Sequence, residues 1–327
     1  MDGAAVKGAR AAHTVLITGA AGNMGTLLAR HLLERTSRLR LMFHHTPLAK
    51  DVSSAANVDA VQADLGDPRT LPAAARDVDV IVHLAGKLFA PRPERFLPIT
   101  NVQWFSNLVD AAIAARVGKI VLASFPQVEG PTSVEDPAMG RLDRVPISTH
   151  ARTRLEEERL LMSRTRGTCT TPVVLRFGVV YGRGLLLIEA ARRLARHGLL
   201  CVWTEPTILQ LIAAPDCVRA AAAAIAAAGV EGIYHVGDDA PVTIQDFLDG
   251  ACEVWGFRRP RRVPMWAVTG GAAFCEDIAY LLGTRTPLTR DLIKLGRVSH
   301  WGDTKRARRE LIPELVHPTF ATGRSIL

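Results

Sequence analysis

The sequence has few features of a secreted, zinc-binding or membrane-spanning protein. Its five cysteines are scattered and form no C-x-x-C pair, which argues against a disulfide framework or a zinc ribbon and favours a reducing compartment. The first twelve residues contain no apolar run typical of a signal peptide. The longest apolar stretch, residues 263–275, is too short to span a bilayer. We therefore expect a cytoplasmic protein without membrane insertion.

Lysine is scarce as well. Only six of the 40 Lys and Arg residues are lysine, so arginine carries the net charge of +8. Two arginine clusters, residues 258–262 and 305–309, contain no aromatic residues on which nucleic-acid bases could stack. We interpret both clusters as solvated surface and expect no nucleic-acid partner. With 48% hydrophobic and 22% charged residues, the 327-residue chain can bury an ample core and is not a disordered protein.

Short apolar runs alternate with helix-like segments along most of the chain. Strands are expected at residues 14–18, 39–43, 58–63, 78–84, 119–124, 172–177 and 232–236. Helices are expected at residues 24–35, 102–116, 148–163 and 219–228. This alternation predicts an α/β fold with a Rossmann-type doubly wound parallel sheet. Beyond residue 242 the pattern is mainly helical, which predicts a smaller C-terminal substrate-binding region.

The same pattern suggests a division of the chain. A flexible N-terminal tail is expected over residues 1–12. A dinucleotide-binding domain is expected over residues 13–180, with its sheet completed by about residues 207–238. The substrate-binding region would then comprise residues 181–206 and 239–327.

A glycine-rich turn, T-G-A-A-G-N-M-G over residues 18–25, follows the first strand and opens the first helix. Glycines at such a turn permit a sharp bend and the close approach of a pyrophosphate, and the helix N-terminus favours negative charge. The turn therefore predicts a dinucleotide site. The residues expected to contact the cofactor here are Gly19, Ala21, Gly22, Asn23, Met24 and Gly25.

This T-G-x-x-G-x-x-G spacing resembles the extended short-chain dehydrogenase/reductase superfamily, which includes NAD-dependent epimerases and dehydratases. Segments further along the chain support the resemblance. Segments 264–266, 287–289 and 303–308 are most similar to the 3β-hydroxysteroid dehydrogenase and dihydroflavonol reductase branches, whose substrates are bulky and apolar. The resemblance implies a nicotinamide cofactor, a small apolar substrate and a homodimer of the kind usual in the superfamily. It also implies cofactor contacts from Asp64, Leu65, Leu84, Ala85, Gly86, Asn101 and Phe177.

The end of the second strand favours NADP over NAD. An acidic residue there would bind the ribose 2′-hydroxyl of NAD, but the positions are held by His44 and His45, with Lys50 close behind. Neutral or cationic donors suit a 2′-phosphate better. We therefore expect NADP as the preferred cofactor and NAD as the alternative.

The residues of the family's reaction are replaced together. Its chemistry uses a Ser or Thr with a Y-x-x-x-K pair, and here His150 stands for the tyrosine and Arg154 for the lysine. Their i, i+4 spacing keeps both on one helix face. Ser124 matches the first serine of the family's segment, and Phe125 takes the usual catalytic position. An imidazole can exchange a proton near neutral pH, whereas arginine can only hold a ribose hydroxyl or phosphate.

Two classes of function remain open. The first is an enzyme acting on a bulky apolar hydroxy or keto compound, with His150, Arg154 and Ser124 as the catalytic group. It would run either a reduction or a non-redox isomerisation, elimination or cyclisation. The second is a catalytically silent NAD(P)-binding sensor or interaction protein. No metal site is expected. The residues expected at the substrate pocket are Lys87, Phe125, Tyr181 and Trp203, with Leu88, Phe89 and Trp266 as further wall residues.

Overall fold

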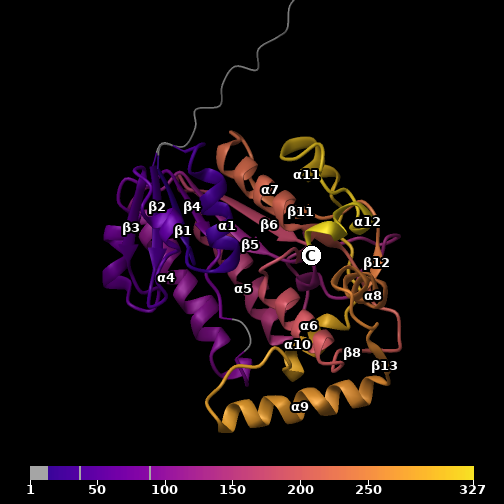
Figure 1. The fold of residues 1–327 in the computed structure, drawn as a ribbon. Coiled ribbons are helices and arrows are strands. Elements are labelled where there is room, and N and C mark those ends of the chain that lie inside the picture. Colours follow the sequence, from indigo (N-terminus) through magenta and orange to yellow (C-terminus); the bar gives the residue numbers. More distant parts are fainter. Residues whose placement is uncertain (1–13, 37, 88–89) are drawn as a thin grey trace, which may run out of the picture.

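The computed structural model describes residues 14–36, 38–87 and 90–327 (Figure 1). The expected N-terminal tail and the wall residues Leu88 and Phe89 lie outside these ranges. Seven parallel strands form the central sheet in the order β11-β6-β5-β4-β1-β2-β3, which confirms the expected doubly wound α/β fold. They are β1 (Thr14–Thr18), β2 (Arg38–Phe43), β3 (Val58–Gln62), β4 (Val80–His83), β5 (Lys119–Ser124), β6 (Thr171–Phe177) and β11 (Gly232–Val236).

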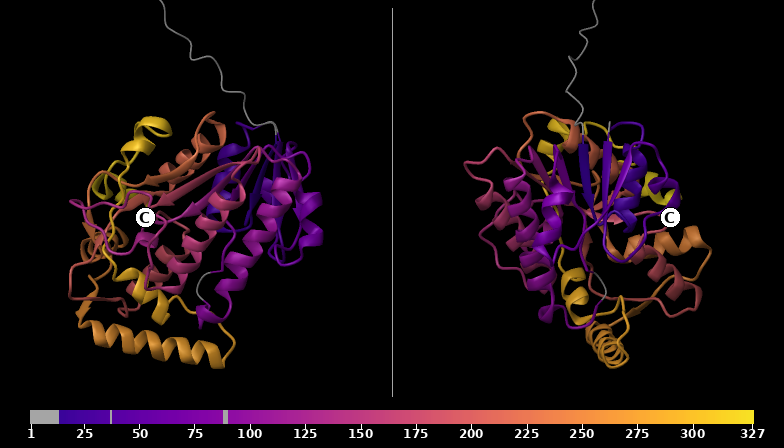
Figure 2. Two further views of the ribbon diagram at one scale, coloured as in Figure 1. Left: turned by 180° about the vertical axis from the view of Figure 1, so that it is seen from behind. Right: turned by 90° about the vertical axis from the view of Figure 1, so that its left-hand side faces the viewer.

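Alternation of side chains along each strand builds two apolar layers, one on each face of the sheet. Val15 and Ile17 pack on one face with α1 and α7, whereas Leu16 packs on the other with α3, α4 and α5. Figure 2 shows these helices on both sides of the strands. The helices are α1 (Asn23–Leu32), α3 (Leu71–Ala75), α4 (Trp104–Ala114), α5 (Thr149–Arg164) and α7 (Ala214–Ala226), and a short α2 (Lys50–Ser53) follows β2.

The remaining elements form the predicted, mainly helical C-terminal part. Its helices are α6 (Leu186–Arg196), α8 (Ile244–Trp255), α9 (Met265–Leu281), α10 (Arg290–Gly296), α11 (Lys305–Glu310) and α12 (Phe320–Gly323). Three pairs of short strands accompany them: β7 (Val179–Tyr181) with β10 (Leu211–Ala213), β9 (Ile208–Leu209) with β12 (Val242–Thr243), and β8 (Cys201–Trp203) with β13 (Arg261–Val263). The expected boundary at residue 180 falls inside β7, and the division into domains stays a prediction.

The sheet brings several polar strand ends to one edge. Thr18 at the end of β1 is in register with His83 at the end of β4, and Ser124 ends the adjacent strand β5. Helix α5 packs against α10, which comes from the C-terminal part. Ligands of open parallel sheets bind at this carboxyl edge. Within the described ranges, no helix has both the length and the apolar character needed to cross a membrane.

Candidate active site

The turn between β1 and α1 has a backbone that only glycine fits at two positions. Gly19 has φ +70°, and a Cβ there would lie 2.7 Å from the backbone nitrogen of Ala85. A Cβ on Gly25 would lie 2.3 Å from the carbonyl oxygen of Gly19. Helix α1 begins after Gly22 without a side-chain cap and without an acidic residue in its first turn. Its first N–H groups can therefore receive an anion.

A cavity of about 220 Å³ opens beside this turn. Asn23 spans it by donating a hydrogen bond from Nδ2 to the carbonyl oxygen of Gly184 (2.6 Å). Two guanidinium groups border it, Arg183 and Arg30, and the latter is bound to Asp51 (2.6 Å). An anion would meet the helix N-terminus and these charges together, so the residues fit a pyrophosphate. The lining residues are Ala21, Gly22, Asn23, Thr26, Leu27, Arg30, Arg183, Gly184 and Leu185.

The ends of β2 and β3 meet where an adenosine would lie. His44 and His45 are exposed, with ring centroids 3.6 Å apart. His44 Nε2 lies 3.5 Å from Oδ2 of Asp64, whose other oxygen accepts a hydrogen bond from the backbone N–H of Gly66 (2.8 Å). No carboxylate stands at the end of β2, as the sequence indicates. A carboxylate does reach the same place from the end of β3.

The end of β4 is built around a neutral histidine. His83 is fully buried, and its Nδ1 shares a hydrogen bond with the hydroxyl of Thr18 (2.8 Å). Burial, together with the nearby charge of Arg154, lowers the pKa of His83 to about 3. Leu84 and Ala85 follow it half-buried, and Gly86 is exposed beside Arg154, where a Cβ would lie 3.5 Å from Nη2.

Helix α5 begins with a histidine–carboxylate pair that sequence reasoning missed. Ser148 is the N-cap and accepts a hydrogen bond from the N–H of Ala151 (3.0 Å). Asp291, from α10, accepts bonds from the backbone N–H groups of Thr149 (2.6 Å) and His150 (3.1 Å). His150 Nδ1 lies 2.7 Å from the same carboxylate. Both side chains are about nine-tenths buried.

The protonation state of this pair follows from its surroundings. Burial alone would raise the pKa of Asp291, but the hydrogen bonds from His150 and from the two backbone N–H groups hold it below its usual value. An ionised carboxylate only accepts hydrogen bonds, so His150 Nδ1 must carry the shared hydrogen. The other ring nitrogen, Nε2, is then the atom left to exchange a proton with a substrate.

One turn further along α5, Arg154 lies between Gly86 and a buried carboxylic acid. Its Nη1 is 2.8 Å from Oε2 of Glu157, which is fully buried. Burial raises the pKa of Glu157 to about 7, and the Arg154 charge limits that rise. The other guanidinium nitrogen of Arg154, Nη2, faces Gly86, which follows β4.

Ser124 is tied into a buried ionic network. Its hydroxyl donates to Glu158, which also binds Arg176 through Nη2 (2.5 Å). Arg176 bonds on its other side to Glu129, and Oε1 of Glu129 lies 3.5 Å from Nε2 of His235. All five side chains are buried. Because its hydrogen is committed to Glu158, Ser124 is set to accept a hydrogen bond rather than to donate one.

The other expected cofactor residues are placed by packing. Asn101 donates from Nδ2 to the hydroxyl of Thr153 (3.1 Å) and so joins the segment before α4 to α5. Met24 and Phe177 belong to the apolar layer beneath α1. Leu65 is buried, and its carbonyl oxygen accepts a hydrogen bond from Nδ2 of Asn107 (2.9 Å).

The expected pocket residues fall into two groups. Phe125 and Lys87 follow strands β5 and β4 at the carboxyl edge, and Lys87 Nζ lies 4.5 Å from the ring centroid of Phe96. In contrast, Tyr181 is fully buried against two phenylalanines, and Trp203 is buried with its Nε1 bonded to Thr207 (2.8 Å). These two side chains expose almost no surface, so their place in a pocket wall stays a prediction.

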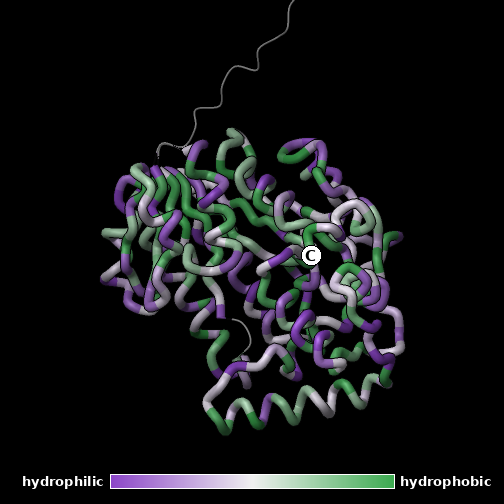
Figure 3. The backbone as a smooth tube through the Cα atoms, viewed as in Figure 1, coloured by the Kyte–Doolittle hydropathy of each residue, from purple (hydrophilic) through white to green (hydrophobic). Residues whose placement is uncertain are grey.

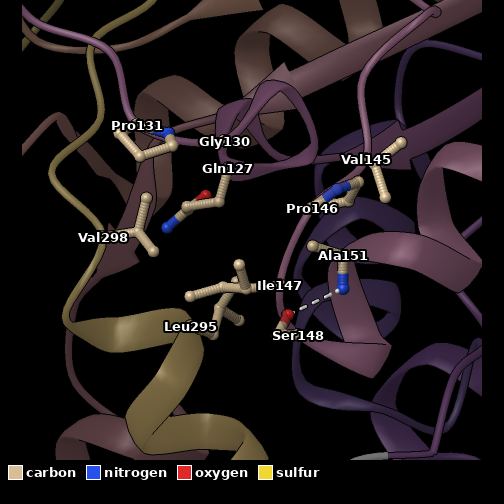
Figure 4. Close-up of a pocket in the computed structure, with 10 residues that line it drawn as sticks. All are labelled: Gln127, Gly130, Pro131, Val145, Pro146, Ile147, Ser148, Ala151, Leu295 and Val298. Atoms are coloured by element: carbon tan, nitrogen blue, oxygen red, sulfur yellow. Dashed lines mark hydrogen bonds between the residues drawn. The ribbon is translucent and has the colours of Figure 1, made fainter.

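An apolar indentation of about 40 Å³ adjoins the N-terminus of α5 (Figure 4). A water molecule takes up roughly 30 Å³, so only a small group fits inside. It lies between the β5–α5 connection and the end of α10, close to the His150 helix turn. Its lining residues are Gln127, Gly130, Pro131, Val145, Pro146, Ile147, Ser148, Ala151, Leu295 and Val298. Among the described residues, no cluster of three or more His, Cys, Asp or Glu side chains is placed to hold a metal ion.

The chain is similar in sequence to two reductases and in fold to a dehydratase. The chain is 26% identical to a 2-alkyl-3-oxoalkanoate reductase of Stenotrophomonas maltophilia, over 90% of this chain and 93% of that protein. It is also 26% identical to a ceramide reductase of Caulobacter vibrioides, over 91% and 89%. The fold matches a dTDP-glucose 4,6-dehydratase of Streptomyces venezuelae with NAD bound, with a TM-score of 0.76 at 21% identity, covering 95% and 94% of the chains.

A family profile described as the NAD dependent epimerase/dehydratase family matches residues 15–237. This span runs from the first strand to the end of β11 and includes the glycine turn, Ser124, His150 and Arg154. It confirms the family resemblance and the expectation of a nicotinamide dinucleotide enzyme. The preference for NADP and the roles of the individual residues stay predictions. The chain belongs to the NAD-dependent epimerase/dehydratase family of enzymes.

Proposed function

We propose that the chain is an NAD(P)-dependent reductase of a bulky, apolar keto compound, in which His150 supplies the proton. The observation that carries this proposal is the 2.7 Å contact between His150 Nδ1 and Asp291, which orients an imidazole at the position of the family's tyrosine. The 2-alkyl-3-oxoalkanoate reductase and the ceramide reductase match over nearly their whole length, and their names favour reduction over a non-redox reaction.

The glycine turn and its cavity would hold the cofactor. Gly22 and the first turn of α1, with Arg183, would bind the pyrophosphate, and His44 with Asp64 would border the adenosine ribose. Arg154 would hold the nicotinamide ribose in place of a lysine, since a guanidinium is a fixed donor. A reduced nicotinamide, when bound, supplies a hydride to the carbonyl carbon.

His150 would protonate the developing alkoxide from Nε2 and recover the proton from solvent. Asp291 acts as a positioning residue, because its carboxylate fixes the Nδ1–H tautomer and stabilises the imidazolium. Ser124, whose hydrogen is committed to Glu158, would not donate to this oxygen, which leaves His150 as its hydrogen-bond donor. Phe125, where the family places a hydroxyl residue, would make the pocket more apolar.

The test is turnover of a 2-alkyl-3-oxoalkanoate and of a shorter, water-soluble keto ester with NADPH and with NADH, followed by the absorbance of the reduced nicotinamide. We expect His150→Ala to lower kcat by a factor of about 10²–10⁴ with little change in cofactor Kd. His197→Ala, an exposed histidine at the end of α6, is the matched control and should keep full activity.

Other results would point elsewhere. Conversion of the keto compound without net cofactor oxidation would indicate an isomerase or lyase that uses the same histidine. Tight cofactor binding without turnover of any keto compound would favour the silent sensor. Full activity of His150→Ala would remove the proposed proton donor.

A further inference from the structure

Helix α9 turns its more apolar side to solvent. Trp266, Phe274 and Leu281 lie on one side of the helix and are 77%, 68% and 81% exposed. Ile278 and Leu282 extend this outer face and are exposed as well. The residues turned toward the protein are instead small or acidic: Ala272, Glu276 and Ala279. An exposed apolar face of this size marks an interaction surface.

Polar contacts on the inner side hold α9 in this orientation. Glu276 accepts hydrogen bonds from the backbone N–H of Arg92 (2.8 Å) and of Arg290 (3.0 Å). The guanidinium of Arg290 also binds Asp277 (2.5 Å), and that of Arg92 stacks 3.5 Å from the ring centroid of Tyr280. Rolling the apolar face inward would break these contacts, turn the buried Glu276 outward and bury the half-exposed Asp277, so the contacts keep the apolar face exposed.

Arginines flank the apolar face at both ends. Residues 258–262 precede α9, and among the described residues no carboxylate lies within 4.0 Å of the guanidinium of Arg258 or Arg261. Arg285 follows the helix and is exposed, and Arg95 donates to the Tyr280 hydroxyl (3.0 Å). The helix itself carries no Lys or Arg.

The helix lies at the margin of the molecule. In Figure 1 it runs along the lower edge, apart from the central sheet, and both views of Figure 2 place it there too. Figure 3 shows apolar residues along much of its length. A helix of 17 residues is about 26 Å long, too short and too flanked by charge to cross a bilayer but long enough to lie along one.

We propose that α9 binds a membrane surface rich in anionic lipids and lies in the plane of that surface. Its apolar face would enter the boundary between headgroups and acyl chains, with Trp266 at the headgroup level, while the flanking arginines bind lipid phosphates. A second copy of the chain fits less well. Antiparallel pairing of two α9 helices would set residues 258–262 of one copy against Arg285 of the other, and parallel pairing would set like clusters side by side.

This inference goes beyond the proposed function and does not depend on it. It has a consequence for that function, however, because α9 packs against α10, which carries Asp291. The membrane-facing side of the protein is therefore next to the element that orients His150.

The first test is flotation with vesicles of phosphatidylcholine alone and of phosphatidylcholine mixed with phosphatidylglycerol. The full chain should float with the mixed vesicles, and less so as salt is raised, because salt screens the arginines. Phe274→Gln/Leu281→Gln should weaken binding by roughly tenfold or more, since two large apolar side chains no longer leave water. Val316→Gln, an exposed apolar residue outside α9, should bind as the parent does.

The second test asks whether binding depends on the arginines beside α9 or only on the net charge of the protein. Arg258→Glu/Arg261→Glu and Arg116→Glu/Arg166→Glu lower the net charge by the same amount, and all four residues are exposed. Only the first pair borders α9, so only it should weaken flotation. Lipids labelled at the headgroup boundary should quench the tryptophan fluorescence of the parent protein. This quenching should be weaker in Trp266→Phe, because that variant lacks the tryptophan placed at that depth.

Three results would overturn the proposal. One is failure of the parent protein to bind mixed vesicles at low salt. Another is equal loss in both charge-reversal pairs. The third is a dimer in sedimentation that Phe274→Gln/Leu281→Gln dissociates, without vesicle binding, which would assign the face to a second copy. Turnover of a water-soluble keto ester should match the parent in Phe274→Gln/Leu281→Gln, so failure of the proposed activity can be told apart from failure of membrane binding.

Discussion

Replacing Asp291 by Asn changes one carboxylate oxygen to an amide nitrogen at the point where His150 is held. The remaining carbonyl oxygen can still accept the bond from Thr149 N–H. The new NH₂ group would face two donors, the backbone N–H and the Nδ1–H of His150, where Oδ2 now accepts both. Asp291→Asn therefore removes two bonds to a charged acceptor.

The size of the effect follows from those two bonds. A hydrogen bond to a charged group contributes about 1.5–3 kcal/mol, so the loss of two should lower the free energy of unfolding by about 3–6 kcal/mol. The amide would also donate to His150 Nδ1 and favour the tautomer with hydrogen on Nε2. In that tautomer Nδ1 carries no hydrogen, so giving up the Nε2 hydrogen would leave an imidazolate anion and not a neutral imidazole. We expect kcat to fall about 100-fold to 1,000-fold, because general acid catalysis contributes 10²–10⁴.

The assay is a double-mutant cycle on keto-ester reduction, with cofactor Kd measured in parallel. If Asp291 acts through His150, adding Asp291→Asn to His150→Ala should cost no further activity. Ser148→Ala is the control for a weakened helix end, since it removes only the cap on Ala151 N–H and should cost about 1 kcal/mol of stability with kcat kept.

Two outcomes would refute this reasoning. Asp291→Asn with unchanged kcat would show that the carboxylate serves only to cap α5. Fully additive losses in the double variant would show that Asp291 and His150 act independently.

Three further predictions concern the scaffold. Gly25→Ala should abolish cofactor binding in fluorescence titrations, since its Cβ would lie 2.3 Å from a carbonyl oxygen of the glycine turn. Burial raises the pKa of Asp238 to about 7, so between about pH 4 and 7 the unfolded chain loses this proton while the folded protein keeps it, and stability falls as pH rises through that range. Urea unfolding at pH 5 and at pH 8 measures this fall in the free energy of unfolding, and Asp238→Asn should make it smaller by on the order of 3 kcal/mol. Arg176→Met should lower stability by about 3–5 kcal/mol by leaving two buried carboxylates unpaired, and an unchanged Tm would contradict this.

The fold could be predicted because its signals are local. Each buried strand is a short apolar run, and all seven predicted strands are present with ends shifted by at most two residues. The glycine turn was equally legible, since the backbone conformation at Gly19 and the close packing at Gly25 exclude other residues. The strands and the glycine turn depend on neighbours in the chain or on backbone sterics. Both can therefore be inferred from the composition and spacing of residues in a short segment.

The contacts within the site could not be predicted in this way. Asp291 contacts His150 although the two are 141 positions apart in the sequence. The T-R-D-L segment that carries Asp291 is typical of any helix start. Arg183 and the network around Arg176 likewise depend on which loops pack together. Trp266 was expected in a pocket wall, but it lies 77% exposed on α9, because an apolar residue does not by itself reveal which side of a helix is buried.

The capping of α5 by a residue of α10 has a consequence for biosynthesis. The chain emerges from the ribosome N-terminus first, and early segments fold before later ones exist. Until residue 291 has been made, the first N–H groups of α5 lack their carboxylate and the His150 imidazole has no partner to hold it. A nascent chain with a complete seven-stranded sheet would therefore still have an unassembled site until α10 has been made and has packed against α5.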